Sequence, residues 1–78
     1  MAIYVRITKK AETESTLTFV YESEGGEGTF ELDRKSGQVA LTKLADSDPK
    51  QTFFRAAAHK VSRAFESGDV PDTLTFAS

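Results

Sequence analysis

The hydrophobic pattern of this chain changes its period once, and that change constrains the fold more than any other feature. Four segments alternate apolar and polar side chains, which is typical of strands with one buried face. They are residues 3–8, 16–22, 29–33 and 38–44. Between residues 49 and 66 the apolar positions recur every three or four residues, which predicts one amphipathic helix. Residues 73–77 then alternate again.

The connections between these segments are short, so the order β-β-β-β-α-β predicts an α+β fold. We expect an antiparallel meander of four or five strands, with the helix packed on one face of the sheet. Residues 9–15 and the glycine-rich residues 23–28 are predicted turns, and Gly37 suits a left-handed position in a hairpin. Residues 73–77 either pair beside the first strand, giving the order 5-1-2-3-4, or form a frayed tail.

The ends of the predicted helix carry capping signals. Asp48 suits the N-cap, Pro49 the first helical position, and Gln51 the third position of a capping box. Gly68 suits the C-terminal stop. The predicted core combines the inward strand positions with the apolar side of the helix. It comprises Ile3, Val5, Ile7, Leu17, Phe19, Tyr21, Phe30, Leu32, Val39, Leu41, Phe54, Val61, Phe65, Leu74 and Phe76.

Length and composition limit the organisation of the protein. The chain has 78 residues and no cysteine. We expect one small domain over residues 1–78 in a reducing compartment, and therefore a cytoplasmic protein. Arg6 interrupts the N-terminal apolar residues, so we predict neither a signal peptide nor a membrane span.

The sequence offers little catalytic chemistry. His59 is the single histidine, and without cysteine a metal site would depend on carboxylates. Phosphate-binding glycine loops and nucleophile-elbow motifs are absent from the sequence. We therefore predict no catalytic, metal or cofactor-binding residues, no cofactor, and no enzyme activity.

Two surfaces are candidates for binding a partner. The polar side of the helix carries Arg55, His59, Lys60 and Arg63, and residues 49–66 hold 4 basic residues against 1 acidic residue. This row is either a solvated helix face, with Glu66 and Ser62 near Arg63, or a surface for anions or nucleic acid. Nucleic acid is the weaker interpretation, because most aromatic residues point toward the predicted core.

The open face of the sheet is the second candidate surface, where Tyr4 and Val20 would form an apolar patch. The resulting hypothesis is a non-enzymatic protein-interaction or regulatory module. Its partner would be another protein or a second copy of the chain in a homodimer. The alternative is a weak nucleic-acid-binding protein that uses Arg55, Lys60 and Arg63.

Overall fold

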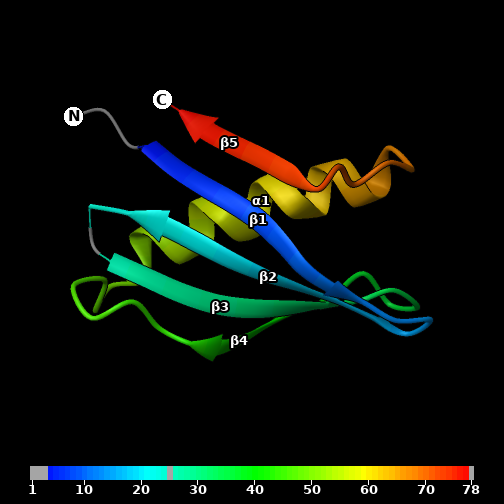
Figure 1. Cartoon of the computed structure of the whole chain (residues 1–78), viewed down its shortest axis with the longest axis horizontal. Helices are drawn as coiled ribbons and strands as arrows, with labels where there is room; N and C mark the ends of the chain where they lie inside the picture. Colours follow the sequence, from blue (N-terminus) through cyan, green and yellow to red (C-terminus); the bar gives the residue numbers. More distant parts are fainter. Residues whose placement is uncertain (1–3, 25, 78) are drawn as a thin grey trace.

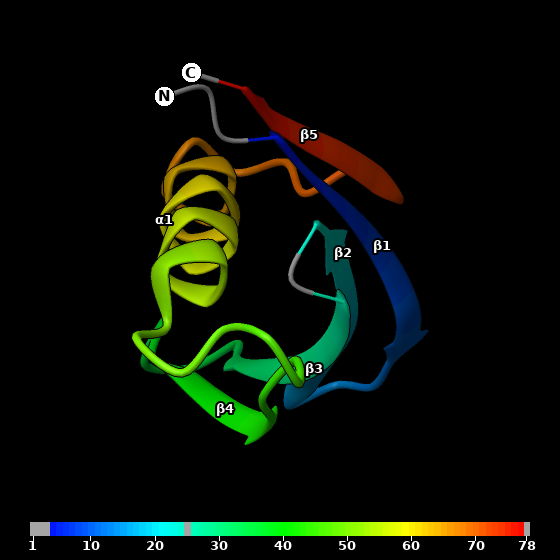
Figure 2. The same ribbon diagram turned by 90° about the vertical axis from the view of Figure 1, so that its left-hand side faces the viewer.

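A computed structural model describes residues 4–24 and 26–77. It contains one five-stranded antiparallel sheet with a helix packed against one face (Figure 1). The elements are β1 (Tyr4–Glu12), β2 (Thr16–Ser23), β3 (Gly26–Asp33), β4 (Val39–Lys43), α1 (Thr52–Glu66) and β5 (Thr73–Ala77). The strand order β4-β3-β2-β1-β5 confirms the α+β prediction. Figure 2 shows that the sheet curves around α1.

The last strand is part of this sheet and not a frayed tail. β5 pairs antiparallel with β1 in unbroken register, from Tyr4 opposite Ala77 to Thr8 opposite Thr73. The order 5-1-2-3-4 is therefore confirmed. β5 is an outer strand, and β4 lies at the other end of the sheet.

Two strands are longer than predicted. β1 continues to Glu12, across a register shift between Lys9 and Ala11, where we expected a loop. β3 begins at Gly26, inside the predicted glycine-rich turn. Exposed polar residues (Lys10, Glu12 and Glu27) and the glycines Gly26 and Gly28 make up most of these two extensions. These residues therefore show no apolar–polar alternation in the sequence, although their backbones pair with β2.

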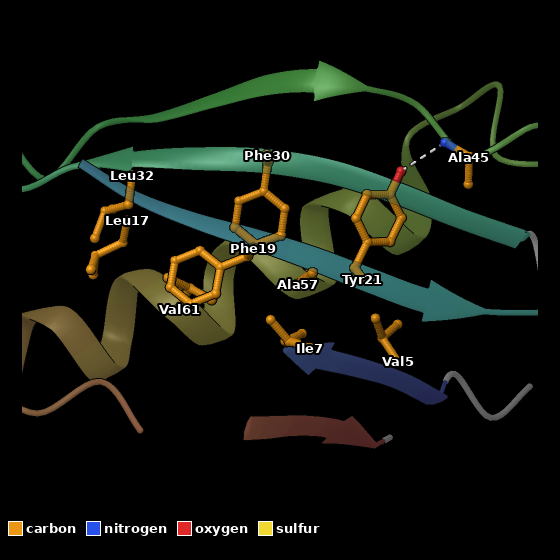
Figure 3. Close-up of a cluster of buried hydrophobic side chains, with 10 residues drawn as sticks. All are labelled: Val5, Ile7, Leu17, Phe19, Tyr21, Phe30, Leu32, Ala45, Ala57 and Val61. Atoms are coloured by element: carbon orange, nitrogen blue, oxygen red, sulfur yellow. Dashed lines mark hydrogen bonds between the residues drawn. The ribbon is translucent and has the colours of Figure 1, made fainter. Parts of the chain in front are cut away.

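Close packing explains the glycine in the extended part of β3. Gly28 lies opposite Tyr21 in the β2–β3 register. A Cβ atom at Gly28 would overlap with the Tyr21 ring. The ring lies across this glycine, and its hydroxyl accepts a 3.0 Å hydrogen bond from the backbone N–H of Ala45 (Figure 3). The bond ties the segment after β4 to the core.

The predicted start of the helix is wrong. The helix begins at Thr52, and the residue before it, Gln51, has a left-handed φ of 60° and makes no side-chain cap. Asp48 still caps the helix from a distance. Its two carboxylate oxygens accept hydrogen bonds from the N–H groups of Phe53 and Phe54, at 3.1 and 3.0 Å. A turn over residues 48–51 therefore replaces the predicted first helical turn.

The predicted stop at the other end is confirmed. Gly68 has a φ of 92°, and its N–H bonds the carbonyl oxygen of Phe65 at 3.0 Å. The N–H of Asp69 bonds the carbonyl oxygen of Ala64 at 3.2 Å. These two bonds form a Schellman motif, which ends the helix and turns the chain toward β5.

The core lies between α1 and the concave face of the sheet (Figure 3). Predicted core residues that are buried are Val5, Ile7, Leu17, Phe19, Tyr21, Phe30, Leu32 and Val61. Predicted core residues that are half-buried are Val39, Leu41, Phe54, Phe65, Leu74 and Phe76. Ala45 and Ala57 are also buried, and Ile3 lies outside the described residues. The outer strands are less covered because one helix cannot span five strands.

Candidate functional site

The basic row of the helix is exposed to solvent. Val61 is fully buried against the sheet, and this orients the opposite side of α1 outward. Arg55, His59, Lys60 and Arg63 are all exposed. The four residues therefore share the solvent-exposed side of the helix. The structure does not bring all of them into one site.

Three of these residues meet β5. His59, Lys60 and Arg63 line an open groove of about 430 Å³ together with Thr75, Phe76 and Ala77. We call these six residues the β5 groove. Arg55 lies about one turn nearer the helix N-terminus and is outside it. The groove forms because β5 returns antiparallel to β1 and lies beside the C-terminal half of α1 (Figures 1 and 2).

The salt bridges among the described residues lie away from the groove. The salt bridges among the described residues involve Lys9, Glu12, Asp72 and Arg34, at the other end of β5. Within residues 4–24 and 26–77, no carboxylate lies within salt-bridge distance of Lys60 or Arg63. The solvated-face interpretation placed Glu66 near Arg63, and these two residues do not form a salt bridge. In the described part of the chain, no neighbouring acid therefore neutralises Lys60 or Arg63.

The backbone of β5 adds hydrogen-bonding groups to one side of this groove. The N–H of Lys9 bonds the carbonyl oxygen of Asp72 at 2.8 Å, which identifies the residues of β5 that face β1. In an antiparallel ladder the hydrogen-bonded pairs alternate. Leu74 and Phe76 therefore direct their backbone groups at β1. Thr73, Thr75 and Ala77 direct theirs away from the sheet, along its open edge.

The side chains of β5 do not protect that edge. Natural edge strands carry charges, proline or a bulge, which discourage pairing with another chain. The sequence Thr-Leu-Thr-Phe-Ala of β5 has none of these residues, and its register with β1 is regular. The opposite edge differs, because β4 contains Lys43 and its pairing with β3 is shifted between Thr29 and Phe30. Of the two edges, β5 is the better template for a new strand.

The two candidates on the open sheet face do not join the groove. Tyr4 is 54% exposed and is opposite Ala77 in the register, but its side chain lies on the face turned away from α1. Val20 is half-buried on the same outer face, between Thr8 and Thr29. Threonine is common on that face, and the hydroxyl groups of Thr29 and Thr42 lie 2.7 Å apart. Because Val20 lies opposite Thr8, four residues along β1 from Tyr4, the two side chains are not neighbours on this face.

A second polar pocket lies at the other end of β5, and charged side chains that form ion pairs line it. Lys9 Nζ lies 3.0 Å from Glu12 and 3.3 Å from Asp72, and it donates a 3.4 Å hydrogen bond to the carbonyl oxygen of Val70. Arg34 completes the network at 3.4 Å from Glu12. The hydrogen bond between Lys9 and Glu12 raises the pKa of the lysine and lowers that of the glutamate. The network fastens the segment before β5 to β1.

The sequence predicted the helix residues of the groove as a binding surface, but not its strand residues. Thr75, Phe76 and Ala77 were predicted as strand residues without a role in binding. The available signal was a strand that lacks charge at a predicted sheet edge. Among the described residues, no three histidine, cysteine, aspartate or glutamate side chains are grouped to hold a metal ion.

Comparison with family models, with curated proteins and with solved structures finds no match to this chain. Within the described residues, no helix is long and apolar enough to cross a membrane. The geometry of the β5 groove is therefore the basis for a functional proposal.

Proposed function

We propose that this domain is a protein-interaction module that binds an extended segment of another polypeptide as a sixth strand beside β5. The observation that carries this proposal is the open, regular and uncharged edge of β5. An added antiparallel strand would bond the backbone groups of Thr73, Thr75 and Ala77. Such bonds supply affinity, and the side chains beside them supply selectivity.

A second copy of the chain fits this edge less well. Two-fold pairing of β5 with β5 would place both α1 helices on the same side of a continuous sheet. Lys60 and Arg63 of the two copies would then face each other across the joint. Like charges at such a joint disfavour the association. A different polypeptide is therefore the better occupant.

Nucleic acid is also a weaker occupant. Proteins that bind single strands combine positive charge with exposed aromatic rings on which bases stack. Tyr4 is the large hydrophobic side chain that stands exposed in the described part of the chain, and it lies on the face away from the groove. Phosphate groups could bind Lys60 and Arg63, but a nucleic acid would not form strand-pairing hydrogen bonds with the backbone of β5.

The test is an NMR titration of the ¹⁵N-labelled chain with the soluble, uncharged peptide Thr-Gln-Thr-Gln-Thr-Gln-Thr. We expect the amide signals of Thr73, Thr75 and Ala77 to shift. The variant Thr75→Pro removes an N–H that points away from β1, so it should block the edge without breaking the ladder with β1. Thr75→Ala keeps that N–H and serves as the matched control.

Two outcomes would overturn the proposal. One is a peptide titration that leaves the β5 amides unmoved or that is unaffected by Thr75→Pro, provided that the variant keeps the dispersed spectrum of the folded chain. The other is a parallel titration with single-stranded or duplex DNA in which Arg55 and Arg63 shift, the shifts fade with salt, and β5 stays silent. Sedimentation equilibrium of the free chain checks the homodimer, and we expect a monomer.

A further inference from the structure

We propose that the added strand is an acidic one, with carboxylate side chains at alternate positions that face α1. This inference rests on the proposed function, because it concerns the partner bound at the β5 edge. It follows from the position of the three helix residues above the inner face of that edge.

The face follows from the register. Leu74 and Phe76 point toward α1, as their partial burial and their position opposite Ile7 and Val5 show. In an antiparallel pair, residues directly opposite each other point to the same face. Partner residues opposite Leu74 and Phe76 would therefore point toward α1. The partner residue opposite Thr75 would point to the outer, threonine-rich face.

The spacing follows from strand geometry. Two inward residues of the partner are separated by one outward residue, which places them roughly 7 Å apart. On α1, Lys60 and Arg63 are three residues apart and His59 and Arg63 are four apart, so these side chains neighbour one another on the helix surface. Two inward side chains of an added strand can therefore meet the basic groups of the groove at the same time.

The positive charge of Lys60 and Arg63 favours acidic side chains at the inward positions of the added strand. Lys60 and Arg63 are exposed and lack acidic partners in the described residues. Phe76 is half-buried and lines the groove, so it offers an apolar surface to the methylene groups of an incoming side chain. Glutamate matches both features, since it has a short apolar stem and a negative end. Lysine at the same position would place like charges together.

The size of the preference can be bounded. Exposed ion pairs contribute weakly, and two of them should strengthen binding by about 2- to 30-fold over an uncharged isostere. The preference should shrink as salt rises from low concentration to about 0.15 M, because exposed charges are screened. Backbone pairing with β5 should be much less sensitive to salt.

The experiment compares three peptides of one length: Thr-Glu-Thr-Glu-Thr-Glu-Thr, its glutamine counterpart and its lysine counterpart. Dissociation constants come from the shifts of the β5 amides at low salt. We expect the glutamate peptide to bind most tightly and the lysine peptide most weakly. In the double variant Lys60→Gln/Arg63→Gln, the glutamate and glutamine peptides should bind equally. Lys10→Gln/Lys35→Gln makes the same change in net charge away from the groove and should retain the preference.

The outcomes separate this inference from the proposed function. If all three peptides shift β5 with equal affinity, strand addition stands and the acidic preference is refuted. The same holds if the remote double variant abolishes the preference as fully as the groove variant, since net charge alone would then explain it. If the glutamate peptide shifts Lys60 and Arg63 but leaves β5 unmoved, both the strand addition and this inference are overturned.

Discussion

Removing one hydroxyl group, in the variant Tyr21→Phe, should destabilise the fold measurably. Tyr21 and Ala45 are both buried, at 0% and 2% exposure. The Tyr21 hydroxyl accepts the N–H of Ala45 at 3.0 Å. Because phenylalanine fills nearly the same volume, the main change is that this N–H loses its partner away from water.

The expected cost follows from the burial of that N–H. A buried donor left without a partner costs about 1–3 kcal/mol. Stability of this chain should total roughly 4–12 kcal/mol by scaling with its length, so the loss is a large share of the whole. In a domain of this size, each kilocalorie lowers Tm by about 4–8 °C. Burial also raises the pKa of Tyr21, so the hydroxyl stays protonated at neutral pH.

The assay is urea unfolding followed by circular dichroism, with Tyr4→Phe as the matched control. Tyr4 is 54% exposed, so the same chemical change there should alter the free energy of unfolding by less than about 0.5 kcal/mol. Equal midpoints for the two variants would refute the reasoning. That result would mean that water or a shift of the segment after β4 satisfies Ala45 when the hydroxyl is removed.

Two further changes test the helix start and the ionic network. Asp48→Ala should cost about 1–2 kcal/mol in urea unfolding, because two helix N–H groups lose their acceptors, and Asp48→Asn should cost less because it keeps one acceptor oxygen. Equal losses for both variants would contradict a two-oxygen cap. The hydrogen bond from Lys9 lowers the pKa of Glu12 from its ordinary value of 4.5, so this carboxylate stabilises the fold above that value. The stabilisation is lost as pH falls through the lowered pKa. Unfolding of Glu12→Gln should therefore depend less on pH below about 4.5 than that of the parent chain or of Glu14→Gln. If the free energies of unfolding of the parent chain and of Glu12→Gln change in parallel with pH, the Lys9–Glu12 pair does not have this role.

The surface that we propose for binding combines features that sequence reasoning treated separately. Arg55, His59, Lys60 and Arg63 were predicted as one row, and the structure places three of them at the β5 groove. Tyr4 and Val20 were predicted on the open face, and they lie there. The strand residues Thr75 and Ala77 acquire a role only because β5 is an outer strand.

The sequence by itself determined the elements and their order. Alternation in the segments that became β2 and β5, and the helical period through Ala57 and Val61, are local patterns. They depend only on which side of one element is buried. The helix stop at Gly68 was also predictable from the sequence, because the left-handed residue that follows many helices favours glycine for a local steric reason.

Tertiary structure decided the start of the helix and the existence of the groove. The carboxylate of Asp48 caps the N–H groups of Phe53 and Phe54 across an intervening turn, which local sequence rules did not predict. These hydrogen bonds depend on the conformation of residues 48–51. Lys60 and Phe76 are separated in sequence and line one groove because β5 pairs with β1 beside the C-terminal half of α1. Contacts of this kind depend on the placement of whole elements, whereas periodicity records only the burial of one element at a time.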